Sequence, residues 1–152
     1  MELSDFFTWL LLIGSLAVFG VGIMVYAYQG KGSLSVLFEQ PLSLSATLPD
    51  SDSGTEAAVQ FQAGYNAYQA GQYRQAVEYF TQAITQESSF AQAYHNRGLA
   101  YANLRQDDDS VISLLAASEL YNQQNNRDGL LLLKQHLAAI KERKLARENK
   151  VS

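Results

Sequence analysis

The sequence repeats itself at a spacing of 34 residues, and this period limits the folds that are open to the chain. When residues 57–90 are aligned with residues 91–124, small residues meet small residues, and Gly64 falls opposite Gly98. Apolar residues recur at helical spacing within each copy. A period of this length is typical of a solenoid whose units are pairs of packed helices. We therefore predict an all-α fold.

Three glycines indicate how the helices of such a pair would meet. Inside a helix each glycine costs roughly 1 kcal/mol relative to alanine, so its position needs a reason. Gly64 shares one sector of a helix with Ala63 and Ala67, and this small stripe would let a second helix approach closely. Gly71 follows the helix, where a left-handed capping residue is favoured and glycine has no Cβ to strain. We predict that Gly64, Gly71 and Gly98 are scaffold positions.

The residues that recur between the copies follow a known pattern. They are Gly64, Gly71, Tyr73, Ala76, Phe80, Ala83 and Ile84 in the first copy, and Tyr94, Gly98, Tyr101, Ser110, Leu114 and Ala117 in the second. This pattern resembles the tetratricopeptide repeat, although Ser88 replaces a usual proline, and Arg105 and Asp107 replace Gly and Tyr in the second turn. The resemblance implies a short helix-turn-helix solenoid over residues 54–124 that binds proteins.

Residues 125–150 are expected to form one long C-terminal capping helix. Two repeats do not close a solenoid core, because about three are normally needed. Leu130, Leu133 and Leu137 lie on one helical stripe that can cover the second repeat. The outer half of this helix is basic and is predicted to be a solvated face, with contact to anionic lipid headgroups as the alternative. Its basic residues are Lys141, Arg143, Lys144, Arg147 and Lys150.

A run without charged residues occupies residues 6–28. As a helix it would span about 35 Å, enough to cross a hydrocarbon core of roughly 30 Å. Aromatic residues stand at both ends, as is typical of membrane interfaces. A cleaved signal peptide would need a basic start and a small-residue cleavage site, which this segment lacks. We predict a single transmembrane helix that anchors the chain in the lipid bilayer.

Lys31 gives a weak indication of how this helix is oriented. It is the one basic residue near either end of the helix, and acidic residues precede the helix. Since positive charge favours the cytoplasmic side of a membrane, the repeats are expected on that side.

Residues 29–53 form the predicted linker between the membrane helix and the repeats. Gly, Ser and both prolines of the chain argue against a helix here. Apolar residues alternate with polar ones, which fits an extended segment with one apolar face. Two interpretations are open: a flexible tether with scattered leucines, or an extended strip that packs on the repeat domain or on a partner. Ser53 and Glu56 match a capping box, so the next helix is expected to begin near residue 54.

The first helices of the two copies are expected to line the concave groove that such solenoids use for binding. Large aromatic side chains at a groove suit an apolar or amphipathic peptide. The alternative is that the aromatic rings cover a neighbouring helix or the linker. The predicted partner-binding residues are Phe61, Tyr65, Tyr68, Gln69, Gln92, His95, Asn96, Leu99 and Asn103.

The sequence offers little support for chemistry beyond binding. The chain has no cysteine, and His95 and His136 are expected to be a polar contact of the groove and a surface or capping contact of the last helix. Residues 107–109 are acidic and suit a helix N-terminus better than a metal site. No nucleophile–base pair or phosphate-binding loop is evident, and the net charge of −4 argues against nucleic acid as a partner. We expect no enzyme activity, no cofactor and no metal.

One membrane helix, an extended linker and a short solenoid together resemble a particular group of proteins. These are the membrane-anchored tetratricopeptide proteins of cyanobacteria and plastids that assist photosystem I assembly. The resemblance rests on architecture and size. It implies a thylakoid membrane location, repeats on the cytoplasmic or stromal side, and subunits of photosystem I as partners. The alternatives are a permanent small subunit of a membrane complex and an import receptor with an N-terminal anchor.

Overall fold

The computed structural model describes residues 36–44 and 52–149, all within one compact unit, Leu34–Ser152. Its helices are α2 (Asp52–Gln69), α3 (Tyr73–Gln86), α4 (Ala91–Asn103), α5 (Asp107–Gln123) and α6 (Arg127–Glu148). No strand occurs among the described residues, so the predicted all-helical architecture is confirmed for them. The predicted membrane helix at residues 6–28 lies outside the described residues. From α2 to α6, no helix combines the length and the apolar character needed to cross a membrane.

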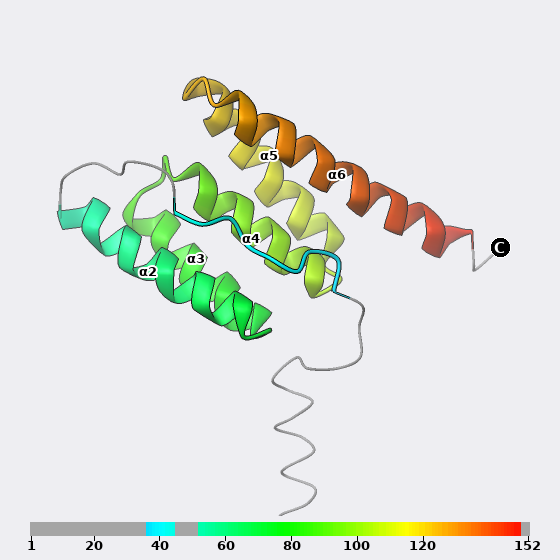
Figure 1. The fold of residues 1–152 in the computed structure, drawn as a ribbon, viewed down its shortest axis with the longest axis horizontal. Coiled ribbons are helices and arrows are strands. Elements are labelled where there is room, and N and C mark those ends of the chain that lie inside the picture. Colours follow the sequence, from blue (N-terminus) through cyan, green and yellow to red (C-terminus); the bar gives the residue numbers. More distant parts are fainter. Residues whose placement is uncertain (1–35, 45–51, 150–152) are drawn as a thin grey trace, which may run out of the picture. The chain divides into compact units, whose positions relative to one another are not determined.

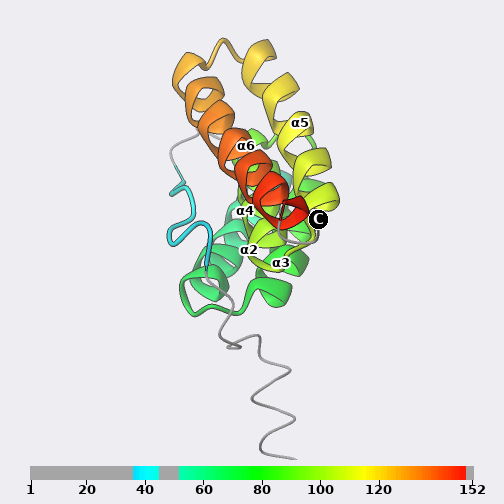
Figure 2. The same ribbon diagram turned by 90° about the vertical axis from the view of Figure 1, so that its right-hand side faces the viewer.

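Each helix packs against the helix that follows it, and α4 also contacts α2 and α6 (Figure 1, Figure 2). Glycine sets the approach within each helix pair. A Cβ atom on Gly64 would lie 2.7 Å from the ring of Phe80, and one on Gly98 would lie 2.8 Å from Leu114. Both distances are too short for a carbon–carbon contact, so α2 meets α3 and α4 meets α5 in the same way.

The same turn ends three of the helices. A residue with positive φ follows each helix: Gly71 (φ 74°), Arg105 (φ 64°) and Asn125 (φ 54°). The amide of the next residue then donates to a carbonyl five residues back, in the pattern of a left-handed helix cap. These bonds run from Gln72 to Ala67, from Gln106 to Tyr101 and from Asn126 to Tyr121, at 2.9, 3.0 and 2.9 Å. Hence α6 is joined to α5 by the turn that also joins α2 to α3 and α4 to α5.

Candidate functional site

Residues 36–44, here called the strap, form a largely extended segment, with bends at Leu37 and Glu39, that runs along α4 (Figure 1). The strap lies in the predicted linker, and it packs on the helices. It contacts Tyr68 of α2, Asn96 and Asn103 of α4, and His136 of α6. These four residues are here called the strap site. Three helices that are separated in sequence therefore hold one short extended segment.

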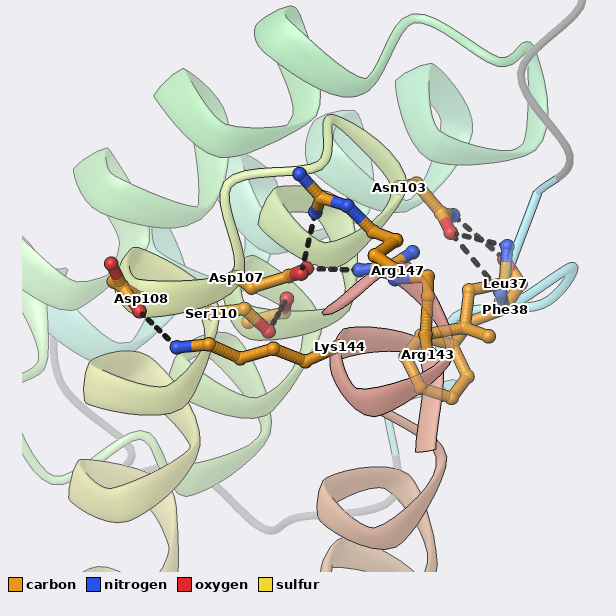
Figure 3. A network of polar contacts seen from close by, with 10 residues as sticks. Leu37, Phe38, Asn103, Asp107, Asp108, Ser110, Arg143, Lys144 and Arg147 are labelled. Atoms are coloured by element: carbon orange, nitrogen blue, oxygen red, sulfur yellow. Dashed lines mark hydrogen bonds and ion pairs between the residues drawn. The ribbon is translucent and has the colours of Figure 1, made fainter. Parts of the chain in front are cut away.

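Asn103 binds the main chain of the strap at two consecutive residues. Its Oδ1 accepts hydrogen bonds from the amides of Leu37 and Phe38, each at 3.0 Å (Figure 3). Its Nδ2 donates to the carbonyl of Phe38 and to the hydroxyl of Tyr68, each at 2.8 Å. A side-chain amide has two donor hydrogens and two acceptor lone pairs, so the hydrogen-bonding capacity of Asn103 is filled. Because Asn103 is 5% exposed, leaving any of these groups without a partner would cost about 1–3 kcal/mol.

Tyr68 and Asn96 hold the strap on either side of Pro41. The hydroxyl of Tyr68 donates to the carbonyl of Phe38 at 2.8 Å, and burial raises the pKa of this hydroxyl, which keeps its proton in place. The amide of Asn96 pairs with both main-chain groups of Leu42, at 2.8 Å in each direction. Since Leu42 lies opposite residue 96 and Phe38 opposite residue 103, the strap runs antiparallel to α4.

Phe38 and Pro41 are the strap side chains that are buried. Phe38 is 9% exposed, and its ring packs against the imidazole of His136, with 4.7 Å between ring centroids. The exposed residues of the strap are Val36, Glu39, Gln40, Ser43 and Leu44. Leu37 and Leu42 are half-buried, and Leu37 packs against the core. The strap site therefore contacts the main chain at several points and buries two side chains, Phe38 and Pro41, three residues apart.

Behind Phe38, His136 belongs to a buried chain of polar groups. Nδ1 of His136 lies 2.8 Å from Nε2 of His95, whose Nδ1 lies 3.2 Å from the hydroxyl of Tyr121. Burial, and to a smaller extent His136, lowers the pKa of His95 to about 3, and burial also lowers the pKa of His136. Both imidazoles are therefore neutral near pH 7, which suits two ring nitrogens that share one proton.

Ion pairs connect α5 and α6 near the Asn103 end of the strap (Figure 3). Asp107 pairs with Arg143 and also lies 3.3 Å from Arg147. The side chains of Asp107 and Arg143 are 9% and 10% exposed, so this pair is largely removed from water. This corrects the expectation of a solvated basic face at Arg143. Lys144 and Asp108 form a second pair at 3.5 Å, and both remain exposed.

Some of the predicted binding residues contact the strap, and others do not. Tyr68, Asn96 and Asn103 contact the strap, and His95 supports it through His136. Gln92 is buried, and Tyr65 is half-buried and accepts a hydrogen bond from Gln69, at 3.0 Å. Binding of a partner at these positions stays a prediction.

Phe61 and Leu99 lie in the core, which corrects their expected place along the groove. Both are fully buried. The ring of Phe61 packs against Phe90 and Phe80, with centroid distances of 4.8 and 5.5 Å. His95 stands 34 residues after Phe61, at the equivalent position of the second repeat, and is also fully buried. The second repeat therefore has a polar ring at this core position.

The sequence did not predict that His136 contacts the strap, or that asparagine side chains form hydrogen bonds with the main chain of the strap. The alternation of apolar residues in the linker was a signal for an extended strip with one buried face. No comparable signal marks His136, because its partners lie 41 and 98 residues away in the sequence.

Residues 57–89 and 91–124 each match the family model of the tetratricopeptide repeat. These ranges hold most of α2 with α3, and α4 with α5, so the two helix pairs are tetratricopeptide repeats. Repeats of this kind form scaffolds for binding other proteins. The comparisons with curated proteins and with solved structures gave no match.

Proposed function

We propose that the chain is a membrane-tethered scaffold that holds partner proteins while a membrane complex is assembled, with photosystem I as the client complex. In this proposal residues 6–28 anchor the chain in the thylakoid membrane, and the repeats lie on the cytoplasmic or stromal side. The uncharged run and Lys31 support the anchor and its orientation. The two tetratricopeptide repeats support the binding of protein partners.

The contact between the strap and Asn103 carries the proposal. Asn103 binds main-chain groups, which every peptide possesses, and Tyr68 and Asn96 add further main-chain bonds. A surface that holds one extended segment in this way is suited to hold an extended segment of another protein. Because the hydrogen bonds go to the main chain, segments that differ at the exposed positions of the strap can still bind, so one scaffold can serve several subunits of a complex.

Affinity purification of the full chain from detergent-solubilised photosynthetic membranes tests this function. Two changes should each abolish recovery of client subunits: deletion of residues 1–30, and the double substitution Asn96→Ala/Asn103→Ala. Gln82→Ala is the matched control, because Gln82 is exposed on α3 and away from the strap site. Mass spectrometry would identify the subunits and measure their amounts relative to the chain.

An assembly factor should be enriched on incomplete complexes and depleted from the mature complex. Undiminished client recovery by both the deletion and the double substitution would contradict the proposal. A fixed stoichiometry in the mature complex would also contradict it and would indicate a permanent subunit.

A further inference from the structure

The strap is held as a peptide ligand would be held. We propose that it occupies the site of a partner segment of the same chemistry, which displaces residues 36–44 when it binds. That partner segment is extended and carries an aromatic residue three positions before a proline. This inference rests on the proposed function, because it names the kind of segment that the scaffold binds.

The polar contacts of the strap can be reproduced by another peptide. Within the strap, Asn96, Asn103 and Tyr68 bond only to main-chain amides and carbonyls, at residues 37, 38 and 42. No side chain of the strap takes part in these bonds. An incoming extended segment with the same register would satisfy the same buried polar atoms, so exchange of segments leaves none of them without a partner.

The apolar contacts of the strap define which segments fit. Phe38 is buried against His136, and Pro41 is buried three residues later. Glu39 and Gln40, which lie between them, are exposed and make no demand on the sequence. Leu37, just before Phe38, is half-buried against the core. The strap site therefore recognises an aromatic residue that follows an apolar one and stands three positions before a proline.

The strap competes with such a partner mainly because it is part of the same chain. A short tether gives an attached segment an effective concentration of about millimolar. A free peptide of the same sequence therefore binds poorly while the strap is docked. Weakening the strap without changing the strap site should increase the affinity for the free peptide.

Two substitutions in the strap provide this test in the full chain, purified in detergent. Phe38→Ala removes the aromatic anchor, and Pro41→Asp places a charge at the second buried position. Both lie outside the helices, and circular dichroism would verify that the helices are retained. Val36→Ala is the matched control, because Val36 is exposed in the same segment. The probe is a fluorescein-labelled peptide with the sequence of residues 34–44, and its binding is followed by fluorescence anisotropy.

We expect the Phe38→Ala and Pro41→Asp chains to bind the peptide at least tenfold more tightly than the wild-type and Val36→Ala chains. A peptide with alanine in place of its phenylalanine should bind the Phe38→Ala chain at least tenfold more weakly. Adding Asn103→Ala to Phe38→Ala should remove peptide binding. The inference would be overturned if the labelled peptide bound the wild-type, Val36→Ala, Phe38→Ala and Pro41→Asp chains with equal affinity. It would also be overturned if the Phe38→Ala chain bound both peptides equally.

Light scattering tests whether a second copy of the chain is the occupant instead. A wild-type dimer that becomes a monomer with Phe38→Ala would overturn the inference, since it would show exchange of straps between copies. Failure of peptide binding, with client recovery still dependent on Asn96 and Asn103, would overturn this inference alone. Peptide binding by Phe38→Ala, with no client recovered by any chain, would support this inference and contradict the proposed function.

Discussion

Asn96 and Leu42 exchange two hydrogen bonds: Oδ1 of Asn96 accepts from the amide of Leu42, and Nδ2 donates to its carbonyl, each at 2.8 Å. A side-chain amide has the same donor and acceptor as a peptide group, so Asn96 pairs with the strap as a neighbouring strand would. Asn103 forms the same pair with Phe38, and its Oδ1 also accepts from the amide of Leu37, where the strap bends. A helical surface thus satisfies an extended segment at two points without any strand.

Each asparagine should protect its own part of the strap against hydrogen exchange. Asn96→Ala should increase the exchange rate of the Leu42 amide, and Asn103→Ala the rates of Leu37 and Phe38. Since a hydrogen bond contributes about 1 kcal/mol net, the increase should be at least about fivefold. Residue-resolved hydrogen–deuterium exchange measures this, with Gln82→Ala as the control. Equal acceleration of all three amides in either variant would indicate that the strap detaches as one unit.

Acidic pH should destabilise the repeat domain through His95 and His136. In the folded chain the pKa of His95 is about 3 and that of His136 is lowered, whereas in the unfolded chain each imidazole takes up a proton near pH 6.5. The unfolded state therefore binds more protons below pH 6.5, and the free energy of unfolding decreases as the pH falls from 6.5 towards 3. The slope is at most about 1.4 kcal/mol per pH unit for each imidazole.

Urea unfolding of the full chain in detergent, at neutral pH and at about pH 5, measures this slope. The double variant His95→Gln/His136→Gln lacks both titrating groups and should show a smaller dependence on pH. The same slope in the variant and the wild type would assign the acid sensitivity to other groups.

The ion pair between Asp107 and Arg143 should contribute far more to stability than the pair between Asp108 and Lys144. Asp107→Ala leaves a largely buried guanidinium without its carboxylate and should lower the free energy of unfolding by about 3 kcal/mol. Asp108→Ala breaks an exposed pair and should have no measurable effect. Denaturant unfolding compares the two variants. An equal loss of stability would show that the burial of Asp107 adds nothing to its ion pair.

Gly64 and Gly71 should respond to alanine for different reasons. Gly64→Ala places a Cβ against the ring of Phe80, and overpacking of this kind costs about 1–3 kcal/mol. Gly71→Ala meets no atom within 4 Å, so its cost of about 1–2 kcal/mol comes from the positive φ alone. Adding Phe80→Leu should offset part of the first loss and none of the second. Thermal unfolding of the single and double variants measures this coupling, and equal coupling to both glycines would contradict it.

The repeats were predictable because their signals are local. The spacing of Gly64 and Gly98 indicated close helix contacts, and the glycine at position 71 indicated a left-handed turn. Asn125 is of a residue type that tolerates the left-handed conformation, but Arg105 is not, and the same turn there carried no such signal. There the backbone conformation is imposed by the packing of the helices that it connects.

The site was less predictable, because each of its contacts joins distant residues. Phe61 was assigned to the groove from its helical stripe, yet the first helix of a repeat is covered on two sides, and the stripe alone does not distinguish them. Asp107 and Arg143 are 36 residues apart, and nothing local indicates that their helices lie side by side. The linker could be a flexible tether or a packed strip, and these two interpretations likewise differ only in whether it contacts residues 30 or more positions later in the sequence.

Every residue that holds the strap comes later in the chain than the strap itself. Tyr68 follows Phe38 by 30 positions, Asn103 follows it by 65, and His136 lies further still. During synthesis the ribosome therefore releases residues 36–44 before it has made the helices that bind them, and α6 completes the site last. Because the site consists of side chains from α2, α4 and α6, the full set of strap contacts forms only after these helices have packed. Between the packing of α6 and the docking of the strap, the site is complete and a client segment would meet no competitor there.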